Sequence, residues 1–142
     1  MTLAQAAGKV ILVGEHAVVY GRPAIAVPVT EVRAEARVES AEVGQGVVVV
    51  APDLGRTIVV RQAAEDEPLA HIVRCTLAAF ELEREPDLTV TVTSTVPIAR
   101  GMGSGAAVST AIVRALTKHE GRWLSSRAIS ELVYQTEVIY HG

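Results

Sequence analysis

The sequence predicts an α+β domain in which an early β-sheet carries helices packed on one side. Three observations lead to this prediction. Strand-like segments fill most of the first half of the chain, and apolar residues recur at helical spacing over 66–80 and from 104 onward. A single strand-like segment separates the two helical parts. Strands that cluster early and helices that follow later favour an α+β layer over a doubly wound parallel sheet.

Several strand-like segments precede the first predicted helix. Residues 8–19 form two short apolar runs, and a turn at 21–23 leads into further apolar residues. In residues 30–40, polar residues alternate strictly with small or apolar ones, which is typical of a strand with one solvent-exposed face. Residues 44–60 indicate two strands around a turn at Asp53, Leu54 and Gly55. The inward faces of the alternating segments are predicted to be Val32, Ala34, Ala36 and Val38, and later Leu88, Val90 and Val92.

Three helices are expected. The first begins at Asp66-Glu67-Pro68, where acids and a proline suit a first turn. The second follows a glycine-rich stretch and ends at Gly121. The third begins at Ser125 or Ser126. The apolar stripes of these helices are Leu69, Ile72, Val73, Leu77 and Phe80; Ala107, Val108, Ala111, Ile112 and Ala115; and Ile129, Leu132, Val133, Thr136 and Tyr140.

The composition excludes several classes of protein. With 142 residues, 49% of them hydrophobic, the chain has the size and apolar content of one folded domain. The net charge is −3, acids and bases are interspersed, and aromatics make up 4%, which argues against a nucleic-acid partner. No apolar run is long enough to cross a membrane. The single cysteine, Cys75, is expected to be a buried hydrophobe, and the chain is expected to be cytoplasmic.

The stretch PIARGMGSGAA, residues 97–107, is the strongest functional candidate. It joins a strand to a helix that starts near Ser104, so backbone N–H groups at the positive end of a helix could bind an anion. Gly101, Gly103 and Gly105 would let a phosphate approach closely, and the hydroxyl of Ser104 could bind phosphate or magnesium. The alternative is a tight strand-to-helix turn in which Ser104 only caps the helix.

Two common glycine motifs do not fit this stretch. Gly101-x-Gly103-x-x-Ala106 matches the dinucleotide-binding pattern, but another helix follows where that fold requires a second strand. The Walker pattern fails because no Gly-Lys-Ser/Thr is present.

Charged residues at both ends of the chain are further candidates. Lys9 starts an apolar strand, where its ammonium either meets an anion or reaches solvent. Glu15 and His16 follow a glycine. A glutamate in this setting is more often a turn residue, and a histidine flanked by apolar residues is more often a hydrogen-bonded core residue than a catalytic one. Glu137 borders the apolar stripe of the last helix, where it is either a magnesium ligand or an exposed acid.

Three separated segments resemble the signature segments of the GHMP kinases, which transfer the γ-phosphate of ATP to small molecules. These are GKVILVGEHAVVYGRPAIAVPV, PIARGMGSGAAVSTAIVRAL and the terminal TEVIYHG, and their wording is close to that of the mevalonate kinases within the family. The resemblance implies the family's N-terminal domain, a fold also called ribosomal protein S5 domain 2-like. It also implies phosphorylation of mevalonate in isoprenoid synthesis, with ATP and Mg²⁺ as cofactors and a homodimer left open.

The resemblance assigns roles residue by residue. Lys9 would lie near the reacting hydroxyl, Glu15 and His16 would shape the substrate pocket, and Ser104 with Glu137 would hold Mg²⁺. The residues that would bind the ATP phosphates are Pro97, Arg100, Gly101, Met102, Gly103, Ser104, Gly105, Ala106 and Ala107. A phosphomevalonate kinase and a nucleotide-binding module without catalysis are the alternatives.

The sequence departs from the family pattern in three places. Gly105 stands where the family usually has a second serine, and Ala7 precedes Gly8 where a proline is usual. The family's catalytic aspartate would lie about six residues beyond Gly142, by the spacing of its motif, and a C-terminal domain would follow. Residues 1–142 are therefore expected to be the N-terminal domain only, inactive in the absence of the second domain.

Overall fold

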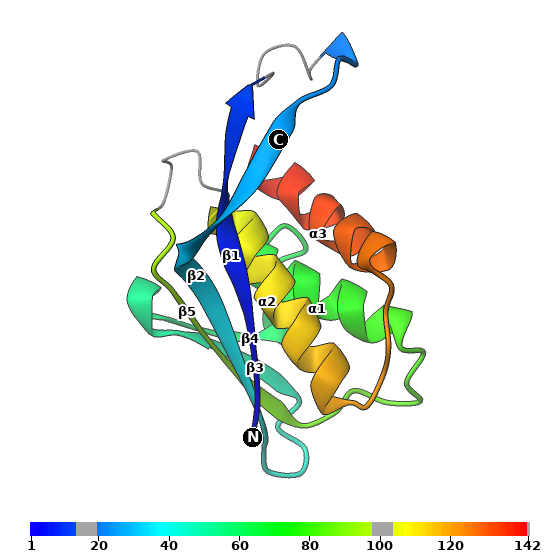
Figure 1. Cartoon of the computed structure of the whole chain (residues 1–142). Coiled ribbons are helices and arrows are strands. Elements are labelled where there is room, and N and C mark those ends of the chain that lie inside the picture. The colour runs from blue at the N-terminus through cyan, green and yellow to red at the C-terminus, as the bar shows by residue number, and fades with distance from the viewer. Residues whose placement is uncertain (14–19, 98–103, 142) are drawn as a thin grey trace.

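One mixed β-sheet with helices against one of its faces makes up the domain (Figure 1). The computed structural model describes residues 1–13, 20–97 and 104–141. In this part the strands are β1 (Thr2–Val13), β2 (Ile25–Ser40), β3 (Val47–Ala51), β4 (Arg56–Val59) and β5 (Leu88–Ser94). The helices are α1 (Pro68–Ala79), α2 (Ser104–His119) and α3 (Ser126–His141), with short 3₁₀ turns η2 (Pro52–Leu54) and η3 (Val60–Gln62). The α+β prediction is confirmed.

The strands lie in the order β1-β2-β5-β3-β4. All neighbours are antiparallel except β3 and β5, which are parallel and are joined through α1. β5 pairs with β2 only along 34–40, so the remainder of β2 pairs with β1 alone. β1 and β2 therefore continue past the rest of the sheet as a two-stranded arm (Figure 1).

The alternating segments bury the face that the sequence predicts. Ala34, Ala36 and Val38 of β2 are fully buried, and so are the inward residues of β5, among them Val90. Helix α2 covers β1 and β2, and α1 and α3 pack beside it on the same face of the sheet (Figure 1). The core between these layers is made of small and branched apolar side chains, which allows a close approach of α2 to the sheet.

The helix boundaries follow from local chemistry. The carboxylate of Glu67 accepts a hydrogen bond from the N–H of Ala70 at 2.8 Å and caps α1, with Pro68 in its first turn. α2 ends at His119, and Gly121 adopts a φ of 64°, which a residue with a side chain rarely takes. The hydroxyl of Ser125 accepts from the N–H of Ala128 at 3.1 Å and caps α3.

Three expectations need amendment. β1 begins at Thr2, six residues before the apolar run that marked it, because pairing with β2 supports the small residues at its start. β2 joins two predicted segments into one strand of 16 residues. Cys75 is half-buried rather than buried, although its surroundings still raise the pKa of its thiol through desolvation.

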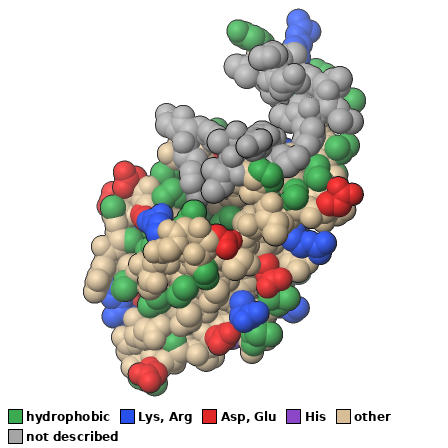
Figure 2. Space-filling view, turned by 90° about the vertical axis from the view of Figure 1, so that its left-hand side faces the viewer, with side chains coloured by type: hydrophobic (Ala, Val, Ile, Leu, Met, Phe, Trp, Pro, Cys, Tyr) green, Lys and Arg blue, Asp and Glu red, His purple; other side chains and the backbone are tan. Residues whose placement is uncertain are grey.

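The surface agrees with the charge pattern of the sequence. Acidic and basic side chains are interspersed over the face shown in Figure 2, without a large patch of one sign. Within the residues placed by the structure, none of the helices combines the length and apolarity needed to cross a bilayer.

Candidate functional site

The first turn of α2 is the centre of the candidate site. β5 ends at Ser94 and α2 begins at Ser104, so the glycine-rich stretch connects a strand to the N-terminus of a 16-residue helix, as predicted. Pro97 lies on the β5 side of this connection and is exposed. Arg100, Gly101, Met102 and Gly103 lie outside the described residues, as do Glu15 and His16.

An apolar hollow of about 290 Å³ opens beside this first turn. Ser104 and Gly105 form one border, and Asp53 and Leu54 of the turn η2 form another. Its walls are apolar side chains from four parts of the chain: Leu69, Val92, Val96 and Val108 among them. Sites for small molecules are typically concave and mostly apolar with a few polar groups, and this hollow has that character.

Asp53 organises the rim of the apolar hollow. Its carboxylate accepts a hydrogen bond from the N–H of Ser94 at 2.8 Å, which holds η2 against the end of β5. The sequence pattern identifies Asp53 only as a turn residue. Its place beside Ser104 depends on the pairing of β3 with β5, which the local pattern does not reveal.

A second hollow lies on another side of the same turn, between the arm and α2. It is lined by Gly8 and Lys9 of β1, Val27 of β2, and Ala106 and Ala107 of α2, among others. Lys9 is half-buried and pairs in the sheet with Pro28. The structure thus brings Lys9 to the first turn of α2, nearly 100 residues away in sequence. Of the residues that the structure describes, none that lines this hollow is acidic.

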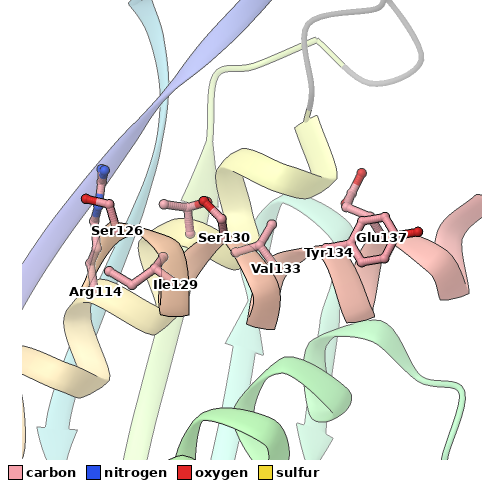
Figure 3. A pocket seen from close by; sticks show the side chains of 8 residues that line it. Arg114, Ser126, Ile129, Ser130, Val133, Tyr134 and Glu137 are labelled. Carbon is pink, nitrogen blue, oxygen red and sulfur yellow. The ribbon is translucent and has the colours of Figure 1, made fainter. Parts of the chain in front are cut away.

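The third hollow separates α2 from α3 (Figure 3). Ser130 and Glu137 line it from α3, and Thr110 and Arg114 line it from α2. Glu137 is half-buried and lies toward the C-terminal end of α3, whereas Ser126 and Arg114 lie at the opposite end of the hollow (Figure 3). The predicted position of Glu137 at the edge of the apolar stripe agrees with this placement.

Thr110 and Arg114 border both the second and the third hollow, so these two adjoin along α2. Arg114 Nη1 donates a hydrogen bond to the carbonyl oxygen of Gln5 at 2.8 Å and ties α2 to β1. The sequence analysis missed Arg114, whose only local signal is a charge within an otherwise apolar helix.

Three of the described candidates therefore surround the N-terminal half of α2. Ser104 borders the apolar hollow, Lys9 the second hollow and Glu137 the third. Within the described ranges, no three His, Cys, Asp or Glu side chains form a group that could hold a metal ion without help. Ser104 and Glu137 line different hollows, so neither hollow contains both predicted metal ligands. Each is an oxygen donor of the type that Mg²⁺ prefers, and this ion is commonly bound by one or two carboxylates together with phosphate oxygens of a substrate.

The chain is similar in sequence to a known family of proteins. The sequence model of a family described as GHMP kinases N terminal domain matches residues 70–142, just over half of the chain. The mevalonate kinases of Pyrococcus horikoshii and Thermococcus onnurineus are 33% and 34% identical to the chain and align with 99% of it. The alignments cover 45% and 46% of those proteins, so the chain spans about half the length of these relatives.

Solved structures give the same result for the fold. A crystal structure of a mevalonate kinase matches 100% of the chain with a TM-score of 0.84 at 22% identity, over 48% of that protein. Mevalonate kinase from methicillin-resistant Staphylococcus aureus matches 99% of the chain with a TM-score of 0.68 at 33% identity, over 46% of its length.

Proposed function

Because the chain belongs to the family of the GHMP kinases N-terminal domain, we propose that it is the ATP-binding part of a mevalonate kinase. In this proposal ATP phosphorylates a hydroxyl of mevalonate and gives 5-phosphomevalonate, and Mg²⁺ accompanies the nucleotide. The observation that carries the proposal is the pair of hollows on two sides of the first turn of α2, one apolar and one containing Lys9.

The two hollows match the two ends of a phosphoryl transfer. A phosphate chain at the N-terminus of α2 would meet backbone N–H groups and the positive end of the helix dipole. The nucleotide base would then enter the apolar hollow beside Ser104 and Leu54. The acceptor would approach from the side of Lys9, which places donor and acceptor on either side of the transferred group.

Lys9 has a direct electrostatic role in this proposal. An ammonium group near the acceptor hydroxyl favours its ionised form and neutralises charge on the transferred phosphoryl group. Among the described residues, those that line the second hollow include two bases, Lys9 and Arg114. Glu15 and His16 remain predicted to shape the acceptor pocket.

Ser104 and Glu137 remain the proposed residues for Mg²⁺. When bound with ATP, Mg²⁺ would neutralise charge on the phosphates. The hydroxyl of Ser104 and the carboxylate of Glu137 are both oxygen donors, the type that this ion prefers. Gly105 offers no side chain where the family usually has a serine, so this chain depends more heavily on Ser104 and Glu137.

A binding experiment tests the proposal on the chain itself. We expect the purified chain to bind a fluorescent ATP analogue, with tighter binding when Mg²⁺ is present. Leu54→Asp places a charge in the apolar hollow at a half-exposed position and should weaken binding at least about tenfold, or 1.4 kcal/mol. Val43→Asp is the matched control, because Val43 is 98% exposed and lines none of the hollows described above.

Acceptor binding and turnover complete the test. With a non-hydrolysable ATP analogue bound, mevalonate should perturb NMR signals of the chain, and Lys9→Ala should remove this effect. We expect no mevalonate-dependent formation of ADP by residues 1–142, because transfer needs both domains to orient the hydroxyl. A folded chain that binds no ATP would refute the proposal, and ADP formation above a Lys9→Ala blank would refute the inactivity of the domain alone.

A further inference from the structure

A partly buried hydrogen bond joins α1 to α3. The hydroxyl oxygen of Thr136 lies 2.9 Å from Nδ1 of His71, and Thr136 is fully buried. Two other buried threonines satisfy their hydroxyls within their own helices: Thr76 donates to Ile72 and Thr117 to Val113. Thr136 instead reaches a side chain of a neighbouring helix, so its contact constrains how α3 sits against α1.

The two sides of α3 face different helices. Ser130, Val133 and Glu137 line the hollow against α2 (Figure 3). Ile139 lines a different hollow, together with His71 of α1. Successive residues of an α-helix are about 100° apart around its axis, so Glu137 lies about a quarter-turn from Thr136. Thr136 therefore occupies the buried middle of α3, and Glu137 occupies the edge toward α2.

We propose that His71 and Thr136 are positioning residues that set the rotation of α3 and thereby aim the carboxylate of Glu137 at the nucleotide-bound metal. This inference rests on the proposed function, because it requires Glu137 to be the metal carboxylate. His71 and Thr136 touch neither metal nor nucleotide. They act through the backbone of α3, in which Thr136 and Glu137 are consecutive.

The size of the effect follows from the geometry of a helix. A side-chain tip lies about 6 Å from the helix axis, so a rotation of about 10° moves a carboxylate by about 1 Å. The close-packed side chains between α3 and its neighbouring helices already resist such a rotation. The hydrogen bond adds to this resistance, because a shift of about 0.5 Å at the Thr136 hydroxyl takes its 2.9 Å contact with His71 beyond good hydrogen-bond distance. The bond to His71 therefore adds a directional constraint to the packing of α3.

The test compares two substitutions that remove a buried threonine hydroxyl. Thr136→Val keeps the shape of the side chain and abolishes the bond to His71. Thr117→Val is the matched control, because the Thr117 hydroxyl bonds only within α2 at its C-terminal end, and its loss leaves α3 untouched. Thr136→Ser keeps the hydroxyl and is the conservative variant that should restore the wild-type behaviour.

The readout is the Mg²⁺ dependence of ATP binding, which a general loss of packing would not change selectively. For Thr136→Val we expect the Mg²⁺ concentration at half-effect to rise about tenfold, the lower end of the range for groups that orient metal ligands. ATP affinity in EDTA should stay unchanged. Thr117→Val and Thr136→Ser should both behave as wild type.

The outcomes separate this inference from the proposed function. Equal Mg²⁺ dependence in folded Thr136→Val and wild type would overturn the positioning role and leave the ATP-binding proposal intact. Equal losses in Thr136→Val and Thr117→Val, or no recovery in Thr136→Ser, would also overturn it. A wild-type chain without Mg²⁺-dependent ATP binding would overturn both. A partner test is His71→Phe, which removes the nitrogen and should reproduce the effect of Thr136→Val.

Discussion

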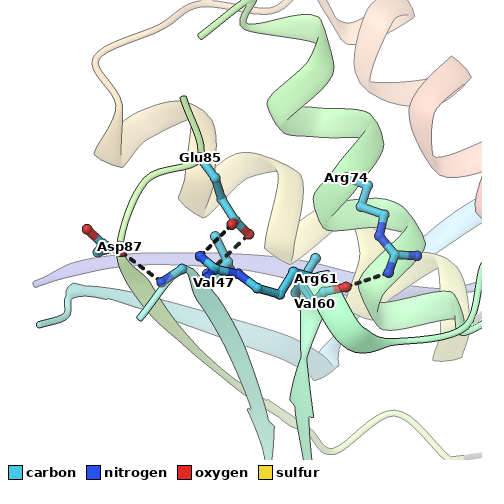
Figure 4. Close-up of polar contacts among 7 residues, drawn as sticks. Val47, Val60, Arg61, Arg74, Glu85 and Asp87 are labelled. Carbon is cyan, nitrogen blue, oxygen red and sulfur yellow. Dashed lines mark hydrogen bonds and ion pairs between the residues drawn. The ribbon is translucent and has the colours of Figure 1, made fainter. Parts of the chain in front are cut away.

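The two ends of strand β5 use polar residues in opposite ways. At its beginning lies a group that we call the loop cluster: Gly46, Val47, Val60, Arg61, Arg74, Glu85 and Asp87 (Figure 4). Glu85 bonds both the N–H of Val47 and the guanidinium of Arg61. At the other end, Lys9 and Ser104 border open hollows around α2. Polar groups of the loop cluster are satisfied by the protein, whereas those around α2 face space that a ligand could fill.

Effects on stability are expected at one end of β5 and effects on binding at the other. A charged group that satisfies backbone atoms contributes to the free energy of unfolding, because its loss leaves buried partners unpaired. A charged group that borders a hollow contributes little to stability and is available to an anion or a metal. Substitutions in the loop cluster should therefore change stability alone, and those around α2 should change binding alone.

Removing Arg74 should have the largest effect on stability. Its guanidinium donates to the carbonyl oxygens of Val60, Ala63 and Ala64, which anchors η3 and the following turn to α1. Arg74→Met keeps the aliphatic stem and should lower the free energy of unfolding by about 2 kcal/mol, measured by urea denaturation. The ATP affinity of the folded variant should not change. A parallel loss of ATP affinity would show that the loop cluster also affects binding.

Arg127→Met is the matched control for Arg74→Met. Arg127 pairs with Glu131 at 3.6 Å, and both side chains are largely exposed. Such a pair contributes at most about 0.5 kcal/mol, so the urea midpoint should barely move.

Around α2, we expect the clearest effect on binding from a serine at position 105. Gly105→Ser adds a hydroxyl in the first turn of α2, where glycine is a poor helix residue, so stability should not fall. One additional oxygen donor contributes about 1 kcal/mol and should tighten Mg²⁺-dependent ATP binding about fivefold. Binding in EDTA is the control. An unchanged Mg²⁺ dependence would show that the missing serine is not a metal ligand in this chain.

The pH dependence of stability should carry a smaller contribution from Asp87. Its pKa lies below the usual 3.8 because the backbone N–H groups of Gly46 and Gly44 donate to the carboxylate, the former at 2.7 Å. A lowered pKa in the folded state stabilises the fold above the unfolded value and loses that contribution as the pH falls through the folded value. Asp87→Asn should therefore flatten the decline of the melting temperature between about pH 5 and pH 2.

If the melting temperature of Asp87→Asn falls as steeply with pH as that of the wild type, other carboxylates cause the loss of stability in acid. Asp53→Asn is the equivalent substitution at the other end of β5, where the carboxylate accepts a hydrogen bond from the backbone N–H of Ser94.

The smallest effect is expected at Ser109 of α2. Its hydroxyl is 1% exposed and has no hydrogen-bond partner among the described residues. Ser109→Ala should leave the thermal midpoint unchanged or raise the free energy of unfolding by up to about 1 kcal/mol, because an unsatisfied buried hydroxyl is unfavourable. A loss of more than that amount in a thermal melt would reveal a structural role for this hydroxyl.

Local sequence patterns determined the elements of this protein and the type of fold. Alternation predicted the buried faces of β2 and β5, and helical spacing with caps predicted α1, α2 and α3, because side-chain direction follows the backbone period. The same reasoning found the strand-to-helix connection before Ser104 and the edge position of Glu137. These features depend only on residues that are close to one another in the sequence.

Only the tertiary structure decided which residues meet. Lys9 shares a hollow with α2 because β1 packs against that helix, and Asp53 shares a hollow with Ser104 because β3 pairs in parallel with β5. Arg114 and the bond of His71 to Thr136 likewise join elements that are distant in sequence. Strand order and helix packing arise from the burial of the whole apolar surface at once, so no local pattern contains them.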